Sequence, residues 1–207
     1  MVKNTYTPPR FILFMGWPGS GKSTLTKELT KTAHIFHIDN DAIRTPILGE
    51  DRESQFYKEA SPKTYEAMYQ LAELNLQSGN SVLIEVPHMR LSTAALEDEE
   101  NYRQRGRVRK IAEDTESLLK IIFAHCPTET LKERIQKRMD ETGTQRDAPK
   151  LANWEAYLAR EIIPFTLESV LFDNVLSVDM SNQMNYNLRK IQEYINASIV
   201  STYRNQQ

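Results

Sequence analysis

The sequence GWPGSGKST at residues 16–24 is the most informative part of this chain. It holds three of the seven glycines, followed at once by a lysine and two hydroxyl side chains. Gly16, Gly21, Lys22 and Ser23 occupy the fixed positions of G-x-x-x-x-G-K-[ST], a loop whose backbone N–H groups surround phosphate oxygens. The pattern therefore predicts a binding site for a polyphosphate, which carries several negative charges and many acceptor oxygens.

The flanking segments supply the context that this motif requires. The apolar run FILFM (11–15) before the loop fits a strand buried on both faces, and TLTKELTKTA after it has helix-compatible composition. The start of that helix adds the positive end of its dipole to the site. We expect Lys22 to face solvent in the empty site and to reach the β- and γ-phosphates of a bound nucleotide. Ser23 is expected to ligate Mg²⁺. The nucleotide is expected to contact Gly16, Trp17, Pro18, Gly19, Ser20, Gly21, Lys22, Ser23 and Thr24.

Composition narrows the class of protein. With 207 residues and a formal net charge of −2, the chain has the size of one domain and lacks the strong basic balance of a general nucleic-acid binder. The single cysteine, Cys126, excludes an internal disulfide and fits a cytoplasmic location. FILFM is too short for a signal peptide or a membrane span. The four histidines show no zinc-type spacing.

Apolar strand-like and helix-like segments alternate along the chain. Strands are expected at 11–15, 34–39, 81–86, 117–126 and 171–179, and helices after the loop and at 62–79, 91–105, 128–141, 153–162 and 182–200. Pro46 and Gly49 predict that 41–54 is partly loop. This alternation predicts an α/β fold in which helices cover both faces of a parallel sheet.

Acidic side chains follow three of the five predicted strands, where the chemistry of an open parallel sheet gathers. Glu85 ends the apolar strand V-L-I-E, and we assign it to the metal side of the site, together with Ser23. The alternative is an ordinary loop carboxylate. His88 lies just beyond Glu85 and is assigned to the substrate site.

Asp41 and Arg44 follow the second strand at a spacing of three. On a helical turn they would lie together, so that Asp41 could accept a hydroxyl proton and Arg44 could bind an anionic group. Asp39 is a competing candidate for the base. The alternative makes Asp41 a helix N-cap and Arg44 a solvated side chain.

The helix at 128–141 carries Arg134 and Arg138, and a polar segment (142–153) containing Arg146 follows. A polar, basic lid can close over the γ-phosphate and exclude water, with Arg138 catalytic and both arginines contacting the nucleotide. The alternative is a solvated basic face balanced by neighbouring acids.

Taken together, these motifs resemble the P-loop kinases of small substrates. The resemblance extends to the AAA-type ATP-binding, zeta-toxin-like kinases related to the 5′-hydroxyl polynucleotide kinase domain. It rests on GWPGSGKST, on IDNDAIR, on TYEAMYQLAELNLQSGNSVLIE and on IIFAHCPTETLKERIQKR. It implies the three-layer sandwich of P-loop NTPases, with a five-stranded parallel sheet in the order 2-3-1-4-5, one domain over 1–207 and a lid at about 134–153. It also implies that Asp41 is the general base, Arg44 a substrate-phosphate ligand and Arg138 the lid arginine.

Two features depart from the family pattern. The third strand ends in E-V-P-H, where many relatives have aspartate, small residues and threonine, and Trp17 is bulky for a position near the substrate. Both departures affect the pocket of the phosphoryl acceptor.

The expected function is an ATP-dependent, Mg²⁺-dependent kinase that acts on a hydroxyl of a small molecule. The alternatives are a P-loop ATPase without a small acceptor and a nucleic-acid 5′-hydroxyl kinase. The chain lacks the N-K-x-D motif of guanine-reading switches. Motor ATPases usually carry a D-E pair after an apolar strand, and here only Glu85 is present at that position. Neither the acceptor nor the oligomeric state follows from the sequence.

Overall fold

The computed structural model describes residues 7–49, 51, 54–86, 99–143 and 147–203. Its centre is a five-stranded sheet in the order β2-β3-β1-β4-β6, with all neighbouring strands parallel. These strands are β1 (Arg10–Gly16), β2 (Phe36–Asp39), β3 (Val82–Glu85), β4 (Leu118–His125) and β6 (Leu176–Asp179). Because β6 is the fifth strand of this sheet along the chain, the order corresponds to the expected 2-3-1-4-5, and the α/β class is confirmed. The short pair β5 (Phe172–Asp173) and β7 (Thr202–Tyr203), which lies outside this sheet, was not expected.

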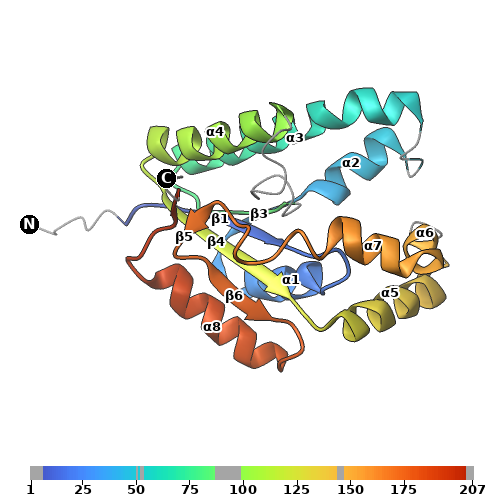
Figure 1. Cartoon of the computed structure of the whole chain (residues 1–207). Helices are drawn as coiled ribbons and strands as arrows, with labels where there is room; N and C mark the ends of the chain where they lie inside the picture. Colours follow the sequence, from blue (N-terminus) through green and yellow to red (C-terminus); the bar gives the residue numbers. More distant parts are fainter. Residues whose placement is uncertain (1–6, 50, 52–53, 87–98, 144–146, 204–207) are drawn as a thin grey trace, which may run out of the picture.

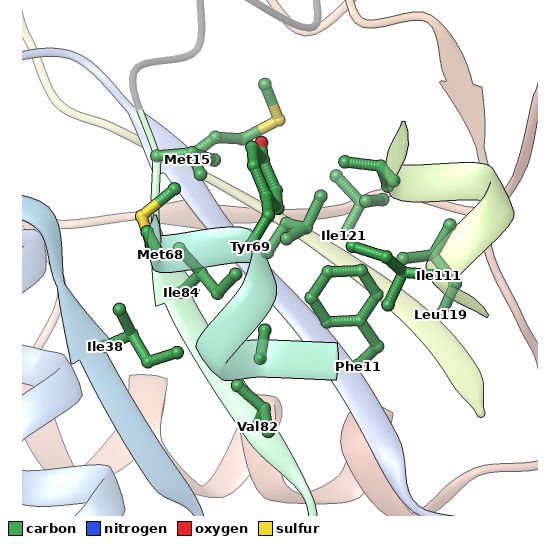
Figure 2. Close-up of a cluster of buried hydrophobic side chains, with 14 of the residues drawn as sticks. Phe11, Met15, Ile38, Met68, Tyr69, Val82, Ile84, Ile111, Leu119 and Ile121 are labelled. Atoms are coloured by element: carbon green, nitrogen blue, oxygen red, sulfur yellow. The ribbon is translucent and has the colours of Figure 1, made fainter. Parts of the chain in front are cut away.

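Helices cover both faces of the sheet and make a three-layer sandwich (Figure 1). One face carries α3 (Gln55–Gln77) and α4 (Glu99–Asp114), and the other carries α1 (Lys22–Ala33) and α8 (Met184–Asn196). Successive residues of β1 alternate between the two cores, as the pleat of a strand requires. Figure 2 shows the core under α3, where Met68 and Tyr69 pack on side chains of the central strands.

The remaining helices lie at the carboxyl edge of the sheet (Figure 1). These are α2 (Asn40–Leu48), α5 (Thr128–Thr142), α6 (Ala148–Ala152) and α7 (Trp154–Glu161). Helices α5 and α7 share a small separate core built from Leu131, Ile135, Tyr157 and Ile162. The polar segment predicted as part of the lid (142–153) contains the short helix α6. Arg146 of this segment falls outside the described residues.

The segment after β2 is more helical than Pro46 suggested. Helix α2 runs through Pro46 to Leu48. The Asp39 carboxylate caps its first turn by accepting from the backbone N–H groups of Asp41 (2.9 Å) and Ala42 (3.4 Å). The proline removes one hydrogen bond close to the helix end, and the chain turns at Gly49. Helix α3 likewise begins seven residues earlier than expected.

A lysine is fully buried in the central part of the sheet. Lys120 of β4 donates from Nζ to the carbonyls of Tyr194 (3.1 Å), Ala197 (2.7 Å) and Ile199 at the end of α8 and just beyond it. Burial lowers the pKa of this ammonium group. The three carbonyls replace the water that the charge would otherwise need.

The prediction of one domain over 1–207 and the extent of the lid stay predictions. In the part of the chain that the structure describes, no helix is both long enough and apolar enough to span a bilayer.

The end of β1 gives a test of the fold. At Gly16, φ is +141°, and an added Cβ would lie 2.1 Å from the carbonyl oxygen of Ala124 on β4. We expect Gly16→Ala to lower the free energy of unfolding by more than about 3 kcal/mol, because the backbone of the central sheet cannot move away.

The matched control is Gly106→Ala in α4, where an added Cβ meets nothing within 4 Å. This variant should gain about 0.5–1 kcal/mol, since alanine favours the helix. Urea denaturation measures both changes, and equal effects of the two substitutions would contradict the argument.

Candidate active site

The phosphate loop connects the end of β1 to the start of α1. Gly21 has φ +100° and serves as the N-cap of α1, so the first N–H groups of the helix point back toward the space that the loop surrounds. The Ser20 hydroxyl is buried and has no hydrogen-bond partner among the described residues. A buried, unpaired hydroxyl inside a loop of this kind suits an acceptor-rich ligand such as a phosphate.

Lys22 is half-buried, and its side chain does not extend into solvent as expected. Its Nζ folds back over the loop and donates to the carbonyls of Gly16 and Trp17, both at 2.9 Å. Burial is the largest cause that lowers the pKa of Lys22 to about 8, while the Glu85 and Asp41 carboxylates oppose this effect. The ammonium group is therefore held among backbone carbonyls, and a phosphate group would replace them as its partner.

Glu85 lies at the centre of a hydrogen-bond network beside the loop. Its carboxylate accepts from Ser23 Oγ (2.7 Å) and Thr26 Oγ1 (2.5 Å), and its Oε1 lies 3.0 Å from His37 Nε2. Burial favours the neutral acid, but the hydrogen bonds from His37, Thr26 and Ser23 outweigh it, so the pKa of Glu85 lies below its ordinary value. Glu85 is consequently a buried carboxylate in its charged form.

The pairing of Ser23 with Glu85 fits a magnesium site completed by a ligand. A hydroxyl and a carboxylate are oxygen donors of the kind Mg²⁺ takes, usually together with substrate phosphates and water. In the described part of the chain, no group of three or more His, Cys, Asp or Glu side chains could hold a metal on its own. The residues present therefore suit an ion that arrives with a nucleotide.

Asp41 and Arg44 form an ion pair on α2, so the two side chains lie together as their spacing suggested. Asp39, not Asp41, is the N-cap. Arg44 is buried, its guanidinium lies 5.4 Å and 6.0 Å from the ring centres of Tyr57 and Tyr65, and its Nε has no partner among the described residues. In the sheet Asp39 pairs with Glu85, which accepts from Ser23, so the start of α2 and this ion pair lie beside the phosphate loop.

The two arginines of α5 have different partners. Arg134 donates to the carbonyls of Ser20 (2.6 Å) and Met180 (2.8 Å), and so joins the phosphate loop to the end of β6. Arg138 pairs with Asp147, a fully buried carboxylate that also accepts from Lys150 Nζ (2.5 Å). Burial opposes the charge of Asp147, but Lys150 and Arg138 lower its pKa. One carboxylate thus holds two cations, Arg138 and Lys150.

A cavity of about 520 Å³ opens at this loop, within the range of ligand sites. Seven of the residues expected to contact the nucleotide line it. The lining consists of Gly19, Gly21, Lys22, Ser23, Thr24, Leu25, Arg134, Arg138, Met180, Asn182, Met184 and Asn187.

The other expected site residues lie outside this lining. Three of them are part of the phosphate loop itself: Gly16, Pro18 and Ser20. Three more lie beside the loop: Asp41, Arg44 and Glu85. Trp17 is half-buried; its Nε1 donates to the carbonyl of Phe165 (2.7 Å) and its ring packs edge-on against Phe123. His88 falls outside the described residues.

Comparison with known proteins identifies the family. A model of the family described as AAA domain matches residues 11–161, well over half of the chain. The chain belongs to this family. A search of curated proteins finds no match.

Solved structures share the fold of this AAA-domain protein at low identity. A provisionally assigned kinase from Chloroflexus aurantiacus j-10-fl is 21% identical, with a TM-score of 0.65 over 91% of this chain and 99% of the other. APS kinase CysC of Mycobacterium tuberculosis, solved with AMPPNP and APS, is 16% identical, with a TM-score of 0.58 over 92% and 100%. Shikimate kinase from Bacteroides thetaiotaomicron is 16% identical, with a TM-score of 0.57 over 91% and 99%.

Four side chains of the AAA-domain site were missed by sequence reasoning. His37 precedes Asp39 by two residues on β2, and Thr26 follows Ser23 by nearly one helical turn, so periodicity could have placed both near Glu85. Asp147 and Lys150 lie in the polar lid segment. Their pairing with Arg138 depends on how the chain folds back, and no local pattern indicates it.

The two hydrogen bonds of Arg134 give a test of how the AAA-domain loop is supported. Arg134→Met should lower the free energy of unfolding by about 2–4 kcal/mol, since it removes charge-assisted bonds from two carbonyls. Lys137→Met is the control, because Lys137 lies on the same helix with 74% of its side chain exposed. It should change stability by less than about 0.5 kcal/mol. Chemical denaturation measures both, and an equal loss in the two variants would refute the supporting role.

Proposed function

We propose that this protein is an ATP-dependent kinase that transfers the γ-phosphoryl group to a hydroxyl of a small molecule. The observation that carries the proposal is the lining of the cavity: the charged side chains of Lys22, Arg134 and Arg138 share it with Ser23, whose hydroxyl donates to the buried Glu85 carboxylate at 2.7 Å. Phosphoryl transfer depends mainly on such positioned charges.

The residues divide the reaction between them. Lys22 and the loop amides would hold the β- and γ-phosphates, exchanging the carbonyl partners that Lys22 has in this structure. Ser23 and Glu85 would hold Mg²⁺, which neutralises phosphate charge when bound. Arg138 and Lys150, placed by Asp147, would stabilise charge on the transferring group.

Asp41 is proposed to accept the proton of the attacking hydroxyl. A bond forms between that oxygen and the γ-phosphorus, the bond to the β-phosphate oxygen breaks, and ADP leaves. Arg44 keeps Asp41 in place through their ion pair and, through its unpartnered Nε, can bind an anionic group of the acceptor.

The fold supports a small acceptor, because the structures of APS kinase and shikimate kinase, which are named for small molecules, align with 92% and 91% of this chain. The acceptor itself remains to be found by assay. ATP consumption should be measured with sugars, nucleosides, aminoglycosides and oligonucleotide 5′ ends, in a cytoplasm-like buffer with Mg²⁺.

Lys22→Met is the control for this screen. Methionine keeps the aliphatic length of the side chain and removes the charge that the phosphates need, so acceptor-dependent turnover should fall below detection. Circular dichroism confirms that the variant is folded. Undiminished turnover by a folded Lys22→Met variant would exclude the proposed site.

The proposed base is tested by Asp41→Asn. Asparagine keeps the shape and can still accept from Arg44, but it is not basic. Transfer should fall by about 10²–10⁴, with ATP affinity unchanged within about threefold. Asp39→Asn is the matched control, since asparagine also caps helices and should cost less than about threefold. Steady-state kinetics with the identified acceptor measure both. Normal rates in both variants would leave Asp41 as no more than a partner of Arg44.

A further inference from the structure

The cavity at the phosphate loop has a second end with different chemistry. The loop and α5 contribute glycines, Lys22 and two arginines. The turn after β6 contributes Met180 and Asn182, and α8 contributes Met184 and Asn187. Helix α8 lies on the same face of the sheet as α1 (Figure 1). A triphosphate held at the loop would therefore direct the rest of the nucleotide toward a mostly uncharged pocket.

Asn187 is the unusual residue of that second end. It is 1% exposed, and its Nδ2 donates to the backbone carbonyl of Asp179 at 2.9 Å. A carbonyl can only accept, so this bond fixes the amide orientation and leaves Oδ1 as a free acceptor. Oδ1 is buried and has no hydrogen-bond partner within the described part of the chain.

A buried acceptor without a partner on the wall of a ligand cavity indicates a donor on the ligand. We propose that Asn187 Oδ1 accepts a hydrogen bond from the exocyclic 6-amino group of adenine, and so sets the base specificity of the site. The inference rests on the proposed function and goes further by naming the residue that distinguishes adenine from 6-oxo purines.

The same geometry rejects guanine and hypoxanthine. Both carry an oxygen at position 6, which would bring two acceptors together where water does not reach. Asn187 cannot turn over to donate instead, because its amide nitrogen is held by Asp179. That carbonyl is itself fixed in a turn, where it also accepts from the backbone N–H of Asn182 at 3.3 Å.

The methionines complete a site for a flat base. Met180 reaches toward the phosphate loop, with its Cε 3.5 Å from the position of a Cβ on Gly21, and Met184 is partly exposed at the start of α8. Thioether side chains adapt to aromatic faces without a hydrogen bond. They would favour any purine equally, so the discrimination comes from Asn187.

The experiment is a series of binding measurements by calorimetry on the whole protein with Mg²⁺. The ligands are ATP, purine riboside triphosphate, ITP, GTP and inorganic tripolyphosphate. ATP should bind about tenfold tighter than purine riboside triphosphate, which lacks the amino group, and ITP and GTP should bind more weakly still.

Asn187→Leu should bring ATP and ITP within about threefold of each other and leave tripolyphosphate affinity unchanged. Asn185→Leu is the matched control, because Asn185 is an exposed asparagine of the same helix and does not line the cavity. It should keep the preference of the native protein.

The outcomes separate the two proposals. If tripolyphosphate binds but ATP, ITP and GTP have equal affinity, the role of Asn187 is wrong and the phosphate site stands. If neither tripolyphosphate nor any nucleotide binds, the proposed function fails and the inference fails with it. If Asn187→Leu does not fold, the ligand series on the native protein still tests recognition of the 6-amino group, and equal affinity for ATP and purine riboside triphosphate overturns the inference.

Discussion

The arrangement of the site depends on the close approach of Gly16 to Ala124. The central strand β1 ends against the backbone of β4 at a point where no side chain fits, and the phosphate loop starts from there. On the other side, β3 ends one strand away, which puts Glu85 beside Ser23 at 2.7 Å. A parallel sheet brings its carboxyl ends to one edge, so one backbone contact places the loop, the carboxylate and α2 together.

The positively charged side chains at that edge already have hydrogen-bond or ion-pair partners within the protein. Lys22 uses carbonyls of its own loop, Arg44 uses Asp41, and Arg138 shares Asp147 with Lys150. Each cation is held close to the place where the proposed function needs it. Such preorganisation reduces the rearrangement required in the transition state, because the positive groups have little distance to move.

The sequence predicted the parts of this protein that depend on local pattern. The loop motif, the five parallel strands and the pairing of Asp41 with Arg44 follow from spacing and strand ends. Asp41 was considered as a helix cap only in the alternative interpretation, and the structure gives that role to Asp39, two residues earlier. Pro46 was given too much weight, because α2 continues through it to Leu48. Lys22 was placed in solvent because its carbonyl partners belong to a loop conformation that no periodicity describes. Lys120 depends on partners 74 or more residues away. Asp147 and Asn187 depend on how the chain folds back on itself, which a single sequence does not indicate.

The buried ammonium of Lys120 has a consequence for how the chain is made. Its partners are the carbonyls of Tyr194, Ala197 and Ile199, and the backbone of β4 also bonds to Ser201. During synthesis, β4 leaves the ribosome long before these groups exist, so its lysine must stay hydrated and the sheet cannot close over it. Completion of the core therefore waits for the last turn of α8 and the residues that follow it. Until those residues are available, this part of the nascent chain is exposed to chaperones and to aggregation.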